Sequence, residues 1–189
     1  YNIIIKGRPG TGKTTLVRAL YEALAAAGVL EGNFVEVKPN ELKLKSGFEE
    51  EVKKAAGGMV FIDEAYELET KRALNNDLNR AINEQGGLPL FVVAGYPDKI
   101  EKWLAHDNPK GNVGLRSRFA YDVTIPDYSA DDLMEIFDMK LRSREMAVTP
   151  EARPLLVQMA HDIAENPQSN NGRDVKQIVD RVQQKWTVR

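Results

Sequence analysis

Short runs of apolar residues alternate with longer segments of mixed polarity through the first two thirds of the chain. Runs of this length, with apolar residues at nearly every position, are typical of strands that are buried on both faces of a sheet. Five such strands are predicted, at residues 1–6, 33–37, 59–62, 90–94 and 121–125.

The segments between these strands predict helices, and a glycine directly follows two of the four, Gly28 after the first and Gly57 after the second. The predicted helices cover residues 13–27, 47–56, 72–84 and 97–106. Because strand and helix alternate, the expected fold class is α/β, with a five-stranded parallel sheet flanked by helices.

The pattern changes after Pro126, since residues 129–189 contain no strand candidate and three helical segments. Ser129, with Asp132 three residues later, resembles a capping box at the start of the first helix. Thr149-Pro150 predicts the start of the second helix, and Pro154 predicts a bend or a late start within it. The third helix is predicted over residues 172–185. We therefore predict two domains, an α/β domain over residues 1–127 and a small helical domain over residues 128–189.

The strongest chemical motif lies between the first strand and the first helix. It reads Gly7-Arg8-Pro9-Gly10-Thr11-Gly12-Lys13-Thr14 and matches the phosphate-binding loop G-x-x-x-x-G-K-[ST] at each fixed position. A bare strand–helix turn would need neither the lysine nor the hydroxyl, so we expect ATP and Mg²⁺ to bind here. Lys13 is placed for the β- and γ-phosphates and Thr14 for the metal ion. The predicted binding set is Gly7, Pro9, Gly10, Thr11, Gly12, Lys13, Thr14 and Thr15.

Two acids end the third strand, in Met59-Val60-Phe61-Ile62-Asp63-Glu64. Ligands bind at the carboxyl edge of open α/β sheets, where these carboxylates would lie. We expect Asp63 to hold Mg²⁺ and Glu64 to act as the general base toward a water molecule. An Asp-Glu pair is also common at the start of a plain loop, but the complete phosphate loop before it favours the catalytic interpretation.

Composition excludes several other kinds of site. The chain has no cysteine, which excludes disulfides and thiolate metal sites, and it has only two histidines. Its 26 basic and 28 acidic residues are spread along the sequence, which argues against nucleic acid as the partner. No apolar run is long enough to cross a bilayer, and nothing at the start of the sequence resembles a signal peptide. We expect no membrane association and a location in the cytoplasm or another soluble intracellular compartment. Because the sequence enters a strand at Tyr1, we also expect an excised domain.

The two motifs and the helical tail resemble the AAA+ superfamily of P-loop NTPases. Further segments narrow the resemblance to the CbbX/CfxQ/SpoVK group, which includes red-type Rubisco activases and the ATPase modules of type VII secretion systems. These segments are Phe61-Ile62-Asp63-Glu64-Ala65-Tyr66, Val92-Val93-Ala94-Gly95-Tyr96, Gly114-Leu115-Arg116-Ser117-Arg118-Phe119 and Ile125-Pro126-Asp127-Tyr128. The resemblance implies that the helical domain is a lid.

The resemblance also implies roles for several residues. Arg118 matches the arginine finger that reaches the nucleotide of a neighbouring subunit, with Arg116 as the second choice; either could instead pair with an acid. Arg173 looks like the lid arginine called sensor 2, although a solvated arginine at a helix start is the alternative. Tyr96 occupies the sensor-1 position, where many relatives carry a polar residue.

One departure concerns the segment Asn40-Glu41-Leu42-Lys43-Leu44-Lys45-Ser46-Gly47-Phe48, which lacks the aromatic-glycine step of a pore loop. Either this chain has lost the loop that grips substrate in the central pore, or residues are missing from the sequence around positions 44–48.

The leading interpretation is an ATP hydrolase that forms a ring-shaped homo-oligomer, a hexamer by resemblance, and remodels a protein partner of unknown identity. The alternatives are a nucleotide-dependent assembly module with weak hydrolysis and, from a third class, a nucleic-acid motor.

Overall fold

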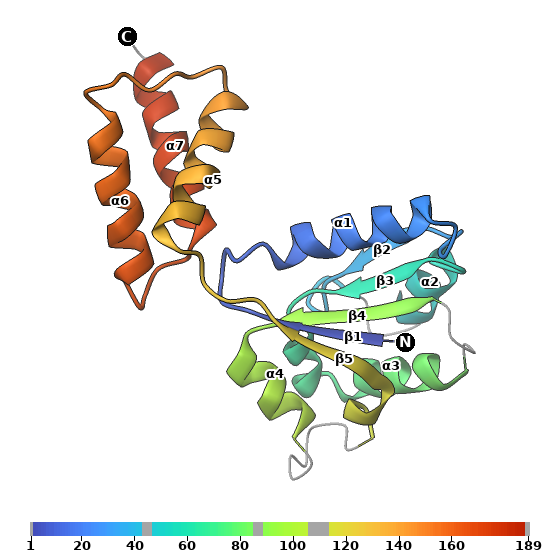
Figure 1. Cartoon of the computed structure of the whole chain (residues 1–189). Coiled ribbons are helices and arrows are strands. Elements are labelled where there is room, and N and C mark those ends of the chain that lie inside the picture. The colour runs from blue at the N-terminus through green and yellow to red at the C-terminus, as the bar shows by residue number, and fades with distance from the viewer. Residues whose placement is uncertain (1, 43–46, 85–88, 106–113, 188–189) are drawn as a thin grey trace. The chain divides into compact units, whose positions relative to one another are not determined.

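The computed structural model describes residues 2–42, 47–84, 89–105 and 114–187, and its sheet has five strands in the order β2-β3-β4-β1-β5. All four neighbouring pairs are parallel, as Figure 1 shows, so the predicted α/β fold with a five-stranded parallel sheet is confirmed. The strands are β1 (Asn2–Lys6), β2 (Phe34–Val37), β3 (Met59–Ile62), β4 (Leu90–Gly95) and β5 (Phe119–Thr124).

Strands β3 and β4 are apolar throughout, and each of their residues is buried, so both of their faces are covered. In β3, Val60 and Ile62 belong to one core cluster, whereas Met59 and Phe61 belong to the other. This two-residue alternation follows from the pleat of a strand, which sends successive side chains to opposite faces. At about 25 cal/mol for each Å² of apolar surface removed from water, two such cores supply most of the driving force for folding.

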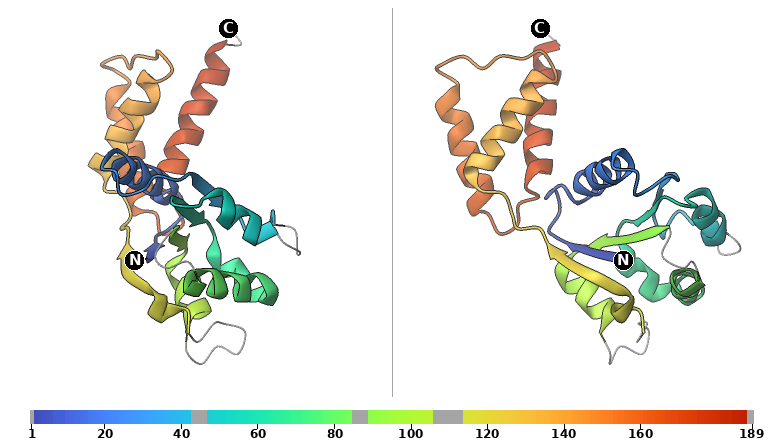
Figure 2. Two further views of the ribbon diagram at one scale, coloured as in Figure 1. Left: turned by 90° about the vertical axis from the view of Figure 1, so that its right-hand side faces the viewer. Right: turned by 45° about the vertical axis from the view of Figure 1, so that its right-hand side comes forward.

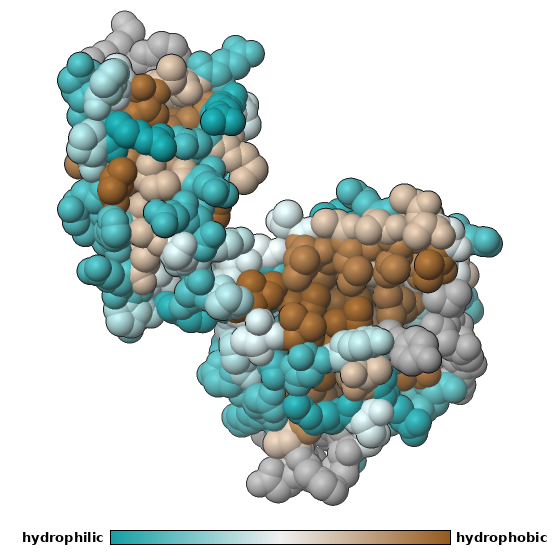
Figure 3. Space-filling view, in the orientation of Figure 1, coloured by the Kyte–Doolittle hydropathy of each residue, from teal (hydrophilic) through white to brown (hydrophobic). Residues whose placement is uncertain are grey.

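The helices of the α/β part cover the two faces of the sheet unequally (Figures 1 and 2). Helices α2 (Gly47–Lys54), α3 (Arg72–Glu84) and α4 (Pro97–Leu104) pack on one face, together with the 3-10 helix η1 (Ala65–Thr70). Helix α1 (Lys13–Ala26) packs on the other face. Figure 3 shows apolar side chains gathered beside α1. Large apolar residues on the surface include Leu16 in α1 and Val123 in β5.

The contacts divide the chain into two compact units. The first contains residues 1–7 and 13–125, and the second contains residues 8–12 together with residues 126–189. The second unit therefore includes the middle of the phosphate loop as well as the helical segment. This grouping could not be predicted from the sequence, since residues 8–12 lie between a strand and a helix of the first unit.

The helical segment consists of three helices (Figure 2): α5 (Ala130–Arg142), α6 (Arg153–Glu165) and α7 (Gly172–Thr187). They enclose a separate apolar core. The predicted capping box is present: Ser129 Oγ accepts from the Asp132 N–H at 3.1 Å, and an Asp132 carboxylate oxygen accepts from the Ser129 N–H at 2.9 Å. These bonds satisfy two backbone donors at the start of α5.

Some predicted boundaries differ from the observed ones. The start at Thr149-Pro150 is wrong, whereas the late start predicted from Pro154 is confirmed. Residues 150–152 form turns, and α6 begins at Arg153 with Pro154 in its first turn. Proline is tolerated in the first turn, where a backbone N–H has no helical acceptor, which explains the late start. The 3-10 helices η1 and η2 (Arg116–Arg118) were not predicted. Helix α4 ends at Leu104, and residue 106 lies outside the described residues.

Among the described residues, no helix has both the length and the apolar character that a membrane crossing requires. The departure expected in the segment 40–48 falls partly on residues 43–46, which lie outside the described ranges.

Candidate functional site

The phosphate loop begins at the carboxyl end of β1 and ends at the first residue of α1. The Gly7 N–H donates to the Gly95 carbonyl at 3.2 Å, which ties the start of the loop to the end of β4. Lys13 is only 8% exposed, and its ammonium group donates to the Gly7 carbonyl at 2.8 Å. An anion that approaches this loop would therefore meet a buried positive charge, and hydrogen bonds between charged groups are among the strongest in proteins.

Two glycines shape the middle of the loop. Gly10 has φ +74° and Gly12 has φ +82°, both in the left-handed region that residues with a side chain rarely adopt. Thr11 between them is buried, and its hydroxyl donates to the Arg8 carbonyl at 2.9 Å. Thr14 and Thr15 lie in the first turn of α1, where Thr14 is partly buried and Thr15 is exposed. The N-terminus of α1 thus adds its own dipole to the loop.

Asp63 and Glu64 directly follow β3, at the carboxyl edge of the sheet. The Glu64 N–H donates to an Asp63 carboxylate oxygen at 3.1 Å, and Glu64 itself has φ +53°. A non-glycine residue in this region is strained, and such strain is concentrated at functional sites.

Burial raises the pKa of both carboxyl groups. For Glu64 the negative charge of Asp63 is the next largest contribution, and for Asp63 the hydrogen bond from the Glu64 N–H opposes the rise. The positive charge of Lys13 lowers the pKa of both acids, so the three groups share one electrostatic environment. A raised pKa brings Glu64 closer to the range in which a carboxylate is an effective general base.

Strand order explains why these residues meet. β4 lies between β1 and β3, so the residue that follows β4, Tyr96, lies between the phosphate loop and the acids along the sheet edge. The Lys13 ammonium group is 5.5 Å from the centroid of the Tyr96 ring. Tyr96 also stacks on Tyr66, with centroids 5.6 Å apart, and the Lys99 ammonium group lies within 4.8 Å of both centroids. The sequence did not predict this stacked pair.

The two candidate finger arginines have different surroundings, although both lie on η2. Arg116 makes ion pairs of 2.8 Å with Glu101 and with Asp122. Lys6 pairs with the same two acids at 2.7 Å, so the four side chains form one network. Arg118 is exposed, and its guanidinium group makes no ion pair or hydrogen bond with another described residue. Glu101 and Asp122 thus neutralise the charge of Arg116, whereas no acid among the described residues pairs with Arg118.

Arg173 is the second residue of α7, in the second unit. Its side chain is exposed, and its backbone N–H donates to the Asn170 carbonyl at 3.0 Å. The preceding Gly172 N–H donates to the Gly10 carbonyl at 3.2 Å, which places the start of α7 against the tip of the phosphate loop.

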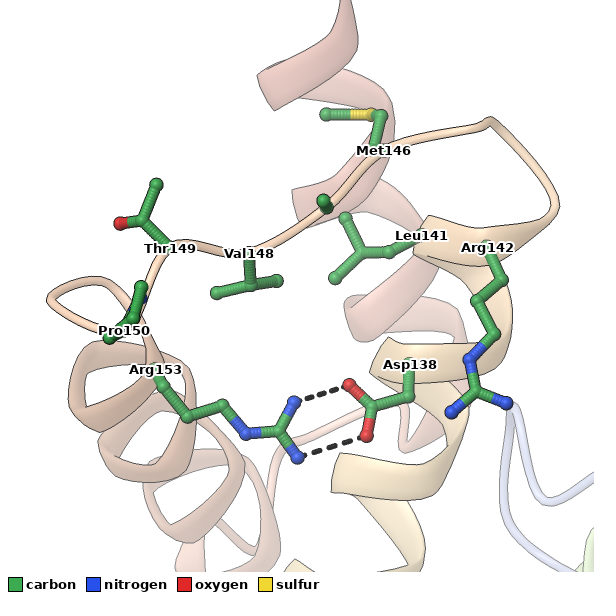
Figure 4. A pocket seen from close by; sticks show the side chains of 9 residues that line it. Asp138, Leu141, Arg142, Met146, Val148, Thr149, Pro150 and Arg153 are labelled. Atoms are coloured by element: carbon green, nitrogen blue, oxygen red, sulfur yellow. Dashed lines mark hydrogen bonds and ion pairs between the residues drawn. The ribbon is translucent and has the colours of Figure 1, made fainter.

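The helical unit also has a pocket of about 410 Å³ beside the connection between α5 and α6 (Figure 4). Leu141, Met146 and Val148 give it an apolar lining. Its acid, Asp138, is bound by both guanidinium nitrogens of Arg153, one of them at 2.9 Å, and this pairing lowers the pKa of Asp138. Because the acid is already paired, we interpret this pocket as part of the structural link between the two helices.

Comparison with known protein families agrees with this geometry. Residues 3–108 match the ATPase family associated with various cellular activities (AAA), and residues 129–189 match the AAA lid domain. The chain belongs to the AAA family. The resemblance predicted from the sequence is thus confirmed at the family level.

Two curated relatives of this AAA chain carry informative names. It is 31% identical to the chloroplastic ribulose bisphosphate carboxylase/oxygenase activase of Cyanidioschyzon merolae, over 93% of the chain and 63% of that protein. It is 32% identical to the ESX-1 secretion system protein EccA1 of Mycobacterium leprae, over 97% of the chain and 35% of that protein. The AAA chain therefore spans less than two thirds of the length of either relative.

Among solved structures, the chain resembles NtrX from Brucella abortus, which was crystallised in complex with ADP. The TM-score is 0.71 with 18% identity, covering 95% of this chain and 44% of that one. At this level of identity, the likeness establishes the fold alone.

Proposed function

We propose that this AAA domain binds ATP with Mg²⁺ and hydrolyses it within a ring-shaped homo-oligomer that remodels a partner protein. The observation that carries the proposal is the shared environment of Lys13, Asp63 and Glu64 at the carboxyl ends of β1 and β3. A buried ammonium group close to two partly buried carboxylates suits the β- and γ-phosphates, a metal ion and an attacking water. The loop residues proposed to bind the phosphates are Gly7, Pro9, Gly10, Thr11, Gly12, Lys13, Thr14 and Thr15.

Asp63 and Thr14 are the residues that would hold Mg²⁺, which supplies positive charge to neutralise the phosphate oxygens. The residues fit this ion, because burial raises the pKa of Asp63 and a divalent cation beside that carboxylate would favour its ionised form. The described residues contain no group of three His, Asp or Glu side chains that could hold a metal ion. That suits Mg²⁺, which commonly takes one or two protein ligands together with phosphate and water oxygens.

In this proposal Glu64 takes the proton of the water that attacks the γ-phosphate. Its raised pKa makes the carboxylate a stronger base, and its place directly after Asp63 keeps it beside the metal ligand. Arg173, which lies at the start of α7, is proposed to contact the nucleotide from the helical domain, for which we keep the boundary at residue 128. Nucleotide-dependent movement of that domain would transmit the energy of hydrolysis.

The surroundings of Arg118 support the proposal of a ring. An exposed guanidinium group with no acid partner among the described residues is available to a neighbouring subunit, where its rigid fork suits phosphate oxygens. Arg116 is less suitable, since Glu101 and Asp122 already neutralise it. We propose a hexamer. The names of the relatives, an activase and a secretion-system protein, favour a protein partner over nucleic acid.

A mixing experiment tests both the reaction and the assembly. Glu64→Gln and Arg118→Ala are each expected to hydrolyse ATP poorly alone, and mixed rings should recover part of the activity. Recovery arises because some interfaces pair the intact Glu64 of one subunit with the intact Arg118 of its neighbour. Arg116→Ala serves as the matched control and should retain most activity by itself.

If subunits mix but no activity returns, Arg118 does not act on a neighbour. If the unmutated protein assembles with ATP but never hydrolyses it, the domain is an assembly module instead.

A further inference from the structure

Three consecutive carbonyl groups at the tip of the phosphate loop accept hydrogen bonds from the helical segment and the residues that lead into it. The Pro9 carbonyl accepts from Asn171 Nδ2 at 3.2 Å. The Gly10 carbonyl accepts from the Gly172 N–H at 3.2 Å, and the Thr11 carbonyl from the Tyr128 hydroxyl at 3.1 Å. All these residues belong to the second compact unit.

These bonds also fix the directions of the N–H groups. In a trans peptide unit, the carbonyl of one residue and the N–H of the next point in opposite directions. Carbonyls held on the side of Tyr128 and Asn171 therefore turn the N–H groups of Gly10, Thr11 and Gly12 to the other side. Among the described residues, no hydrogen bond uses the Gly10 or Gly12 N–H, and that of Thr11 makes only a long contact of 3.5 Å with the Arg8 carbonyl.

We propose that Tyr128 and Asn171 are positioning residues for nucleotide binding. Together with the Gly172 N–H they form a carbonyl clamp, which keeps the peptide units of the loop in the orientation that presents their N–H groups to phosphate. The clamp touches no phosphate itself. Its effect is preorganisation: the cost of ordering the loop is met during folding and does not reduce the binding affinity.

The position of Asn171 is fixed strongly. It is 2% exposed and has φ +51°, and its Oδ1 accepts from the Tyr128 N–H at 3.1 Å. Its Nδ2 also donates to Asp127 Oδ1 at 3.0 Å. The side-chain amide thus links residues 127–128 and the phosphate loop to the start of α7. Arg8 continues the network, since its guanidinium group donates to Asp127 at 2.6 Å and to the Ser169 carbonyl at 2.9 Å.

Gly10 permits the close approach that the clamp requires. A side-chain carbon at Gly10 would lie 1.8 Å from the Asn170 carbonyl oxygen, and one at Gly12 would lie 2.8 Å from the Tyr128 hydroxyl. The glycines of the motif thus serve two purposes, a positive φ and space for the clamp. One signal in the sequence could have singled out Asn171, since asparagine tolerates the left-handed region and here directly precedes a helix. Nothing in the sequence connects it with the phosphate loop.

The clamp proposal rests on the proposed function, and its test distinguishes a failure of the clamp from a failure of that function. Tyr128→Phe removes a single hydroxyl, and Tyr21→Phe is the matched control, because the Tyr21 hydroxyl donates to the Gly32 carbonyl at 2.9 Å away from the loop. Calorimetry measures the affinity of each protein for Mg-ATP and for inorganic tripolyphosphate. Asn171→Asp provides a second variant, since it removes the donor to Pro9 and places a second carboxylate beside Asp127.

We expect Tyr128→Phe to weaken both ligands by about two- to tenfold, the net contribution of one neutral hydrogen bond, and Asn171→Asp to weaken them more. Tyr21→Phe should bind both as the unmutated protein does. In steady-state hydrolysis, Tyr128→Phe should raise KM and leave kcat nearly unchanged, since the loop binds substrate and transition state alike. A purely structural role would lower the active fraction, and so kcat, without raising KM.

Unchanged affinities in both clamp variants, with nucleotide binding intact in the unmutated protein, would overturn the clamp alone. A lowered kcat at constant KM would also overturn it. Failure of the unmutated protein to bind Mg-ATP would overturn the proposed function and the clamp with it.

Discussion

The tip of the phosphate loop and the acidic end of β3 serve the same proposed reaction but are held in place differently. The tip presents backbone groups, and its carbonyls are bound by Tyr128 and Asn171, which lie more than one hundred residues away in sequence. The acids present side chains that are partly buried, have raised pKa values and depend mainly on each other and on Lys13. The tip of the phosphate loop is ordered before a ligand binds, whereas the acidic end of β3 carries an electrostatic cost that a bound ligand would relieve.

This contrast separates binding from catalysis. A backbone that is ordered before binding raises the affinity for a ligand without any change in its own charge. In contrast, the pKa of a partly buried carboxylate changes strongly when a cation or a reacting water arrives. Variants in the two regions should therefore differ in which quantity they alter.

The largest effect is expected at the acidic end. Glu64→Gln should lower turnover by about 10²- to 10⁴-fold, the range for a positioned general base, and leave the affinity for Mg-ATP roughly intact. Single-turnover hydrolysis and a calorimetric titration measure the two quantities on the same preparation. Glu67→Gln, in η1 close by, is the control and should retain activity. Parent-like turnover of Glu64→Gln would show that another group is the base.

A smaller effect, and on the other quantity, is expected in the loop. Lys13→Ala should weaken Mg-ATP by roughly 10- to 150-fold, because a hydrogen bond to a charged group contributes about 1.5–3 kcal/mol. Lys99→Ala tests the specificity of this effect, since its ammonium group also lies over the Tyr96 ring, at 4.8 Å, but belongs to no phosphate motif. Thermal unfolding with and without Mg-ATP reports binding as a raised midpoint. Equal losses in the two variants would contradict a special role for Lys13.

The tip can also be tested through stability. Gly10→Ala adds a methyl group against the Asn170 carbonyl oxygen, whereas Gly28→Ala adds one at a similar φ of +70° into open space. The control isolates the backbone cost, about 1–2 kcal/mol, and should lower the unfolding midpoint by a few degrees. Gly10→Ala should lower it further, because backbone must shift. Midpoints that match within error would mean that the close approach is not needed for stability.

The smallest effect concerns pH. The pKa of Asp63 is raised in the folded state above its usual 3.8, so the folded protein loses stability as pH rises from that value through the raised one. Asp63→Asn removes this loss and should raise the unfolding midpoint slightly at pH 7, with a difference that narrows toward pH 4. Mg-ATP should reverse the order, since only the parent keeps the proposed metal ligand. A midpoint lowered at pH 7 without ligand would contradict the cost assigned to Asp63.

Much of the fold could be read from the sequence because it depends on local patterns. The apolar run 59–62 predicts a strand buried on both faces, since no polar side chain interrupts it, and β3 has these bounds. Ser129 and Asp132 predict a helix start through a bond that spans three residues. The phosphate loop is equally local, because its shape requires glycines at fixed positions and a helix directly after them.

What only the tertiary structure decided involves residues far apart in the chain. Arg116 and Arg118 are equivalent as sequence, but the fold brings Glu101 and Asp122 to Arg116 and leaves Arg118 exposed. Asn171 reads as part of a polar linker until the fold places its amide against Pro9, a separation of 162 residues. The physical reason is the same in both cases: periodicity and turn chemistry act over a few residues, whereas the partner of a charge or a carbonyl is determined by how distant segments pack.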